Sequence, residues 1–273
     1  MLALSPRGLP PPGPSGGSVF PAKGERRGRV ALLQGCAQQV LAPRINQAAI
    51  SLLTRHGIEV VLVKEEQCCG ALTHHMGREA EALAFARANI TAWLAEADRD
   101  GLDAILVTTS GCGTVIKDYG FMLRQDRDFA DRAAQVSALA RDITEYVSGL
   151  DLASAQRHDD IVVAYHAACS LQHGQKITRV PKELLSKNGF VVKDVPEGHL
   201  CCGSAGTYNI LQPDIANKLR DRKVANIAMI KPDMIAAGNI GCMVQIASGT
   251  SIPVVHTIEL LDWATGGPRP GSN

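Results

Sequence analysis

Eight cysteines form two sets of four with almost the same spacing. The first set is Cys36, Cys68, Cys69 and Cys112, and the second set is Cys169, Cys201, Cys202 and Cys242. One constant interval relates the first three members of each set, and a slightly shorter interval relates the fourth, so the pattern is an internal duplication. Four thiolates match the ligand count of a 2Fe-2S or 4Fe-4S cluster, and also that of a structural zinc site.

The adjacent cysteine pair in each set favours a cluster over zinc. Structural zinc sites usually space two cysteines by two to four residues, so that both sulfurs reach one ion. Neighbouring residues of an extended chain point to opposite sides, which suits a cluster whose irons are spread in space. Gly70 and Gly203 follow the pairs, and glycine lets a backbone N–H approach a cluster sulfur, so we expect both at the cofactor. Zinc, or buried thiols without metal, stay open as alternatives.

The elements that must position these cysteines alternate between strands and helices. In the first half we expect strands over 29–35, 58–63 and 103–109, with helices over 43–56 and 78–98. In the second half we expect strands over 161–165, 190–195, 233–237 and 252–256, with helices over 178–188 and 215–227. Each cysteine lies at or just after the carboxyl end of a strand, where open α/β sheets collect ligands. The fold class is therefore predicted as α/β, with two tandem Rossmann-like, doubly wound domains built on parallel sheets.

Composition places the domain boundaries in polar or Pro/Gly-rich stretches. Residues 1–28 are rich in Pro, Gly and Ser and are expected to form a flexible linker. The first cysteine-rich domain is expected over 29–148 and the second over 160–265, with a polar stretch between them.

Charge and motif content narrow the function. Lys plus Arg number 28 and Asp plus Glu number 27 in 273 residues, a balance that argues against nucleic-acid binding. We find no signal peptide and no apolar run long enough to span a membrane, so a cytoplasmic protein is expected. No dinucleotide-binding, P-loop or Ser-His-Asp motif accompanies the cysteines. A redox chain without an organic cofactor of its own is better suited to relaying electrons than to oxidising a substrate.

Several polar residues near the cysteines keep alternative interpretations. His74 and His75 follow the first Cys-Cys-Gly, and His166 precedes Cys169 by three residues. They could tune a cluster, relay protons or replace a ligand, or they could be ordinary satisfied or exposed histidines. Residues 64–66, Lys-Glu-Glu, are expected to form a solvated loop.

At these motifs the sequence resembles the proteins with a duplicated cysteine-rich CCG domain. The stretches CCGALTHHMGRE, YHAACSLQHGQ and HLCCGSAGTYNILQP are most similar to the C-terminal part of glycolate oxidase iron–sulfur subunits, and the similarity extends over residues 18–265. That family also includes cysteine-rich components of heterodisulfide reductases and the lactate-utilisation proteins. Its glycolate oxidase members start with a ferredoxin-like domain, whose cysteine motifs are not in this sequence, so a fragment or a truncated product is expected.

The resemblance implies an electron relay in a glycolate or D-lactate dehydrogenase. A separate FAD-containing subunit would oxidise the substrate, and one or two 4Fe-4S clusters would pass electrons toward a quinone. The resemblance implies that the eight cysteines correspond to two sets of cluster ligands. It also implies that the protein would be cytoplasmic or bound to the inner membrane through its partners. The disulfide reductases end each repeat in Cys-x-x-Cys, whereas Val115 and Gln245 stand at the last position here. A heterodisulfide-reductase-like thiol protein and a zinc or structural docking module remain the alternatives.

Overall fold

The computed structural model describes residues 8, 10–152 and 158–271, and it divides into two compact units. The first unit is Pro10–Asp151, and the second contains the residues from Leu152 onward. The beginning of the predicted linker, residues 1–7 and 9, and part of the predicted boundary segment, residues 153–157, lie outside the described residues. The proposed domain limits 29–148 and 160–265 fall inside these two units.

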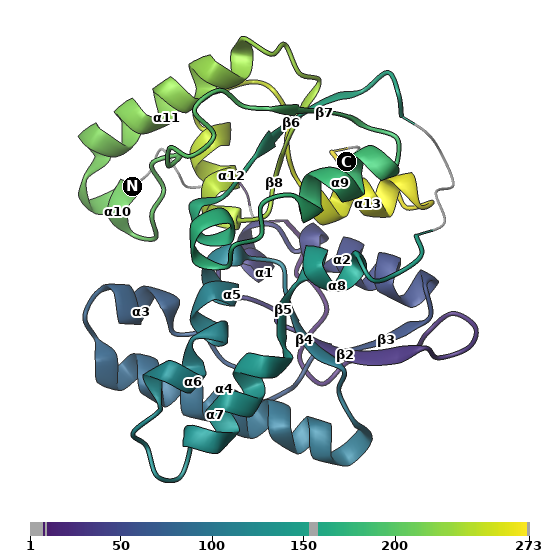
Figure 1. Cartoon of the computed structure of the whole chain (residues 1–273), viewed down its shortest axis with the longest axis vertical. Helices are drawn as coiled ribbons and strands as arrows, with labels where there is room; N and C mark the ends of the chain where they lie inside the picture. Colours follow the sequence, from purple (N-terminus) through teal and green to yellow (C-terminus); the bar gives the residue numbers. More distant parts are fainter. Residues whose placement is uncertain (1–7, 9, 153–157, 272–273) are drawn as a thin grey trace. The chain divides into compact units, whose positions relative to one another are not determined.

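The first unit is an α/β layer structure around a five-stranded sheet (Figure 1). Its strands are β1 (Val19–Phe20), β2 (Gly28–Leu32), β3 (Ile58–Val61), β4 (Ala104–Val107) and β5 (Ala140–Asp142). Its helices are α1 (Gln38–Leu41), α2 (Arg44–Arg55), α3 (Ala71–His75), α4 (Glu79–Asp100), α5 (Ser110–Lys117), α6 (Tyr119–Met122), α7 (Ala130–Leu139) and α8 (Ile143–Val147). The strand order is β1-β3-β2-β4-β5, and only β1 runs antiparallel to its neighbour. Helices α2 and α8 lie on one face of the sheet and α4 and α7 on the other (Figure 1).

The second unit repeats this arrangement with a four-stranded parallel sheet of order β7-β6-β8-β9. Its strands are β6 (Val162–His166), β7 (Val191–Asp194), β8 (Met234–Ala237) and β9 (Val254–His256). Its helices are a single π-helical turn (Ser170–Gly174), α9 (Val180–Lys187), α10 (Tyr208–Leu211), α11 (Pro213–Ala228), α12 (Ile240–Ala247) and α13 (Thr257–Ala264). The predicted fold class, with doubly wound parallel sheets and cysteines at strand carboxyl ends, is confirmed.

The two sheets share their central strand register as well as their order. Val30 pairs with Ala104 across β2 and β4, and Val163 pairs with Met234 across β6 and β8. The intervals from Val30 to Val163 and from Ala104 to Met234 are the same two intervals that relate the cysteines. Strands β4 and β8 are buried along their whole length, as expected for central parallel strands covered on both faces.

In both units, an aspartate makes two hydrogen bonds at the start of the central strand pair. The Asp103 carboxylate accepts a hydrogen bond from the Arg29 backbone N–H at 2.7 Å, and the Asp103 N–H donates to the Arg29 carbonyl at 2.8 Å. In the second unit, Asp233 and Val162 make the same reciprocal pair at 2.8 and 2.9 Å. The recurrence of this aspartate therefore has a structural cause: it satisfies an N–H at the point where the strand ladder begins.

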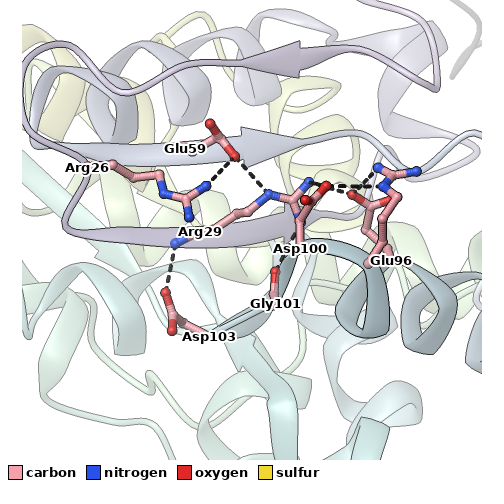
Figure 2. Close-up of polar contacts among 8 residues, drawn as sticks. Arg26, Arg29, Glu59, Glu96, Asp100, Gly101 and Asp103 are labelled. Carbon is pink, nitrogen blue, oxygen red and sulfur yellow. Dashed lines mark hydrogen bonds and ion pairs between the residues drawn. The ribbon is translucent and has the colours of Figure 1, made fainter.

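The Arg29 side chain ties three elements of the first unit together at this same end of the sheet (Figure 2). Its buried guanidinium bonds Glu59 of β3 at 2.7 Å, Glu96 of α4, and the Gly101 carbonyl at 3.0 Å. Five donors in a planar fork let one arginine satisfy several acceptors at once. This cluster fixes α4 against the sheet, and α4 also carries a residue of the cysteine site.

The described part of the predicted linker, residues 10–28, runs along the edge of the first sheet. Val19 and Phe20 pair with β3, and backbone hydrogen bonds join Gly17 to Leu62 and Lys23 to Thr54. A short strand inside a Pro/Gly-rich stretch has no alternating pattern, so composition does not reveal it. The antiparallel pairing covers the edge of β3.

Two candidate cysteine metal centres

Both cysteine sets gather at the carboxyl edge of their sheet, around the point where the strand order reverses. In the first unit the chain leaves β2 toward β3 on one side and later returns to β4 on the other, which makes the β2–β4 pair the switch point. Cys36 follows β2, Cys68 and Cys69 follow β3, and Cys112 lies in the first turn of α5 after β4. The second set occupies the same places after β6, β7 and β8.

The four thiols of the first unit lie in contact with one another. The Sγ atoms of Cys36 and Cys68 are 3.7 Å apart, and Cys69 is within hydrogen-bonding reach of both Cys68 and Cys112. Hydrogen bonds from Cys36 and Cys69 hold the pKa of the Cys68 thiol far below its usual range, while the pKa values of Cys36 and Cys69 are raised in return. Thiols that share hydrogen bonds in this way form a donor set in which a cation can replace the protons.

The second set has the same connectivity with deeper burial at one end. Hydrogen bonds from Cys169 and Cys202 lower the pKa of Cys201, and the pKa values of Cys169 and Cys202 are raised. Cys242 is only 5% exposed, and its pKa is lowered to about 5, first by the Cys202 thiol and then by His166. Asn239 caps α12 by accepting from the Cys242 N–H at 3.3 Å, which places this thiol in the first turn, where negative charge is favoured.

Gly70 and Gly203 approach the sulfur of the first cysteine in each pair. The Gly70 N–H donates to Cys68 Sγ at 3.4 Å, and the Gly203 N–H donates to Cys201 Sγ at 3.3 Å. Both glycines have positive φ, +80° and +91°, and an added Cβ would lie 3.1 Å from the Ala82 carbonyl oxygen at Gly70 and 2.3 Å from that of Ala216 at Gly203. The turn that presents each cysteine pair therefore requires glycine, for conformation and for space.

Buried polar side chains lock the cysteine loops of the first unit. The Gln38 amide donates to Asn46 at 2.7 Å and to Thr108 at 2.6 Å, and Asn46 donates to the Leu33 and Gln34 carbonyls. This network connects the loop of Cys36 to the end of β4. In the described structure each of these polar groups has a partner, so the network holds the Cys36 loop against the end of β4.

Glu66 corrects one expectation, because the stretch predicted as a solvated loop contains a half-buried carboxyl that is hydrogen-bonded within the unit. It accepts hydrogen bonds from the Gln34 N–H at 2.8 Å and from the Trp93 indole at 3.1 Å. Burial raises its pKa to about 7, against these two hydrogen bonds. Glu66 thus joins the Cys36 loop, the Cys68 loop and α4, whereas Lys64 and Glu65 are exposed as expected.

Helices α4 and α11 each place one buried polar residue behind the cysteine pair. In the first unit Asn89 donates to the Cys68 carbonyl at 2.9 Å, and Tyr119 donates to the Cys69 carbonyl at 2.8 Å. In the second unit Lys223 is 2% exposed and donates to the Glu197 carbonyl at 3.0 Å. Burial lowers the pKa of Lys223, while the nearby thiols of Cys202 and Cys201 act to raise it. Sequence reasoning missed these residues, although a lysine within an apolar helix stripe that includes Ala216 and Ile227 was a usable signal.

The three candidate histidines have different environments. His74 is partly buried, His75 is exposed, and their rings lie 5.7 Å apart in α3. His166 ends β6, is 1% exposed, and lies with Cys202 and Cys242 in a group whose ligand atoms are within 4.8 Å of one another. All eight cysteines are free thiols. Converging free thiols with an imidazole beside them fit a metal or cluster far better than a hydrophobic core or a disulfide.

The last position of each repeat is filled by a buried side chain other than cysteine. Val115 and Gln245 are both buried, and the Gln245 amide donates to the Ala216 carbonyl at 3.2 Å. They pack into the unit where a fifth cysteine would stand.

A membrane span needs a long helix of mostly apolar residues. Among those that the structure describes, none has the length and apolar content needed to cross a membrane.

Comparison with known proteins places these features in a family. The glycolate oxidase iron–sulfur subunit of Escherichia coli (strain K12) is 44% identical over 236 residues, covering 86% of this chain and 58% of that protein. The probable glycolate oxidase iron–sulfur subunit of Bacillus subtilis (strain 168) is 30% identical over 90% of this chain and 57% of its own length. The chain therefore spans little more than half the length of these two relatives. Lactate utilization protein A of Exiguobacterium sp. is 26% identical over 85% of this chain and 96% of that protein.

A solved structure and a family model agree with this placement. A hypothetical protein from Helicobacter pylori matches with a TM-score of 0.65 at 10% identity, covering 91% of this chain and 52% of that chain, so it shares the fold. The cysteine-rich domain model, CCG, matches residues 30–117 and 163–247, which contain all eight cysteines. The chain therefore belongs to the family of CCG cysteine-rich domain proteins and carries two copies of that domain.

Proposed function

We propose that the chain is an iron–sulfur electron-transfer subunit of a flavin-dependent glycolate or D-lactate dehydrogenase. The observation that carries this proposal is the convergence of four free thiols at the switch point of each sheet. The names of two relatives, glycolate oxidase iron–sulfur subunits, agree with that chemistry, and a lactate utilization protein is also similar.

In this proposal the two cysteine sets hold one or two 4Fe-4S clusters, which would supply one-electron transfer. Cys36, Cys68, Cys69 and Cys112 form one ligand set, and Cys169, Cys201, Cys202 and Cys242 form the other. The Gly70 and Gly203 N–H groups already donate to cysteine sulfur, and hydrogen bonds of this kind raise a cluster's reduction potential. The half-buried Cys68 and Cys201 leave each set open on one side, as electron exchange with a partner requires.

The partner is proposed to be an FAD-containing subunit that oxidises the hydroxy acid. Electrons would continue to a quinone or another membrane acceptor, and the chain would be cytoplasmic, reaching the inner membrane only through its partners. Substrate oxidation itself is assigned to the partner, because the sequence contains no recognised flavin or nicotinamide motif.

A disulfide reductase fits the structure less well. The position of a fifth cysteine is filled by Val115 in one unit and Gln245 in the other, and both are packed and buried. A zinc-holding docking module is the remaining alternative, since the group of His166, Cys202 and Cys242 also suits zinc.

The test is metal and acid-labile sulfide analysis of the anaerobically purified chain, with electron paramagnetic resonance after dithionite reduction. We expect iron and sulfide in equal amounts and a signal from each occupied set. Cys69→Ser should remove only the first-unit contribution and Cys202→Ser only the second, so that each variant is the control for the other. Zinc without sulfide in the wild-type chain would contradict the electron relay and support the docking module. Absence of any metal would contradict both functions.

A further inference from the structure

His166 occupies a position at which the two units differ in chemistry. It is the last residue of β6 and pairs with Ala237 of β8 in the parallel ladder. The equivalent residue of the first unit, at the interval that relates Cys36 to Cys169, is Leu33, which is 2% exposed and belongs to the apolar core. A leucine satisfies the packing at this site, so packing alone does not explain an imidazole there.

The geometry places the imidazole beside two of the four thiols. A ring nitrogen of His166 and the sulfurs of Cys202 and Cys242 all lie within 4.8 Å of one another. The three residues are 1%, 2% and 5% exposed, so this end of the site is closed to solvent. Separations of this size allow the three donor atoms to share one metal ion after small side-chain movements.

Outside the cysteine site, the imidazole has no hydrogen-bond partner among the described residues. Neither ring nitrogen of His166 has a hydrogen-bond partner of normal geometry, although both are buried. By contrast, the equally buried His256 accepts from the Ile258 N–H at 3.1 Å and caps α13. Leaving a buried polar atom unsatisfied destabilises the folded state, and a metal bond to nitrogen would remove that cost for one of the two atoms.

We propose that His166 is a metal ligand of the second unit, binding through a ring nitrogen the metal centre that Cys202 and Cys242 also ligate, and that the centre of the first unit is held by thiolates alone. The identity of that centre as an iron–sulfur cluster rests on the proposed function. Neutral imidazole is a ligand that iron and zinc both accept, and it gives a higher reduction potential than thiolate in iron–sulfur centres. The metal centres of the two units would therefore have different reduction potentials, and that of the second unit would be the higher.

The test uses the full chain carrying Cys69→Ser, which disables the first set so that the signals report the second unit. His166→Leu introduces the side chain found at the equivalent position of the first unit. His173→Ala is the matched control, because it removes an exposed imidazole from the adjacent π-helical turn. His166→Cys should retain the metal while supplying sulfur instead of nitrogen. Far-UV circular dichroism and thermal unfolding of the metal-free variants verify folding, and His166→Asn serves if the leucine variant fails.

The first measurement is pulsed electron paramagnetic resonance on protein that has been reconstituted with iron and sulfide and then reduced. We expect an imidazole nitrogen coupling in the parent and in His173→Ala, and none in His166→Leu or His166→Cys. Iron bound by the parent without any nitrogen coupling would overturn the ligand role of His166 and leave the relay function standing.

The second measurement tests the ligand role of His166 if the parent binds no iron. Co²⁺ alone is titrated as a zinc surrogate, and its thiolate charge-transfer absorption is followed. A loss of at least tenfold in Co²⁺ affinity in His166→Leu, but not in His173→Ala, would support the ligand while the cluster relay fails. Equal Co²⁺ affinity in parent and His166→Leu would overturn it.

Discussion

Lys223 and Asn89 show how single residues make the surroundings of the two cysteine sets different. Each lies seven residues after the alanine whose carbonyl faces the glycine of the cysteine pair, Ala216 in one unit and Ala82 in the other. Asn89 is a neutral donor to the backbone, whereas Lys223 brings a buried ammonium group close to Cys201 and Cys202. A positive charge near a cluster stabilises the reduced form, which carries one more negative charge.

We therefore expect Lys223→Asn to lower the reduction potential of the second-unit centre. The measurement is a redox titration monitored by electron paramagnetic resonance, with the first set disabled by Cys69→Ser. Lys218→Asn is the matched control, because Lys218 is on the same helix but exposed. An unchanged or raised reduction potential in Lys223→Asn would show that the charge of Lys223 does not stabilise the reduced centre. This prediction rests on the proposed cluster, not on His166 as a ligand.

Asp142 gives a pH dependence that is independent of the cysteines. It caps α8, accepting from the Thr144 N–H at 2.9 Å, and complete burial raises its pKa from 3.8 to about 6, although the Thr144 hydrogen bonds act to lower it. The folded chain therefore holds this proton more tightly than the unfolded chain. The associated stability is fully present below pH 3.8 and is lost as the pH rises through about 6.

Asp142→Asn should flatten this dependence, because asparagine caps helices equally well and does not titrate. Between pH 4.5 and 7.5, wild type should lose about 2 kcal/mol more unfolding free energy than the variant, following about 1.4 kcal/mol per pKa unit. Urea unfolding at the two pH values, on metal-free protein, measures the difference. Asp131→Asn, at an exposed position, should leave the wild-type dependence unchanged. Parallel pH profiles for wild type and Asp142→Asn would contradict the assignment.

At the scale of elements, the turn after the cysteine pair and the helix behind it are coupled through glycine. A Cβ at Gly203 would lie 2.3 Å from the Ala216 carbonyl oxygen of α11, a contact with backbone that cannot rotate away. At Gly77 a Cβ meets nothing within 4 Å, although φ is also positive at +75°. The two positions separate the conformational cost of a side chain from its steric cost.

Gly77→Ala should lower the unfolding free energy by about 1–2 kcal/mol, the cost of a left-handed backbone for alanine. Gly203→Ala should cost roughly 1–3 kcal/mol more, because α11 must move away from the turn. Denaturant unfolding of both variants measures the difference, and metal content reports whether the second set is disturbed. Equal losses in the two variants would mean that the close approach of α11 to the turn is not rigid.

At the scale of the whole molecule, each unit is self-sufficient in its sheet and in its core. The apolar cluster of the first unit is drawn from residues between Ala31 and Ala140, and that of the second from residues between Ala164 and Ile246. All strand pairs in each sheet are formed within one unit. A domain of about 100–150 residues with its own core is generally able to fold alone.

We expect segments 10–151 and 158–271 to fold when produced separately. Each should unfold cooperatively in urea, with an m-value appropriate to its own size, and each should bind its own share of metal. Circular dichroism and metal analysis of the two segments, with the full chain as the control, test this. A segment that stays unfolded alone, but is folded in the full chain, would show that the units depend on each other.

The spacing of residues along the chain was enough to predict the fold class and the two sets of four converging cysteines. Cysteine spacing is a property of the chain, and the duplicated interval predicts two equivalent sites whatever the details of packing. Parallel strands also bring their carboxyl ends to one edge of the sheet, so the thiols of Cys36, Cys68 and Cys112 had to converge. The strands β2, β3, β4, β6, β7, β8 and β9 were predictable to within about three residues, because each is an apolar run between turn signals. Strand β5 was not predictable, because its three residues, Ala-Arg-Asp, are too few to show an alternating apolar pattern.

Which other side chains face the cysteines became evident from the packing of the helices against the sheets. The buried faces of α4 and α11 depend on how each helix is rotated against its sheet, so Asn89 and Lys223 could not be assigned from spacing. Glu66 looked like part of a solvated loop because its partners, Gln34 and Trp93, are distant in sequence. His166 was one open candidate among three until β6 placed it beside Cys202 and Cys242. The number of cysteines in each set follows from the sequence, but the surroundings that distinguish one set from the other arise from contacts between residues far apart in the chain.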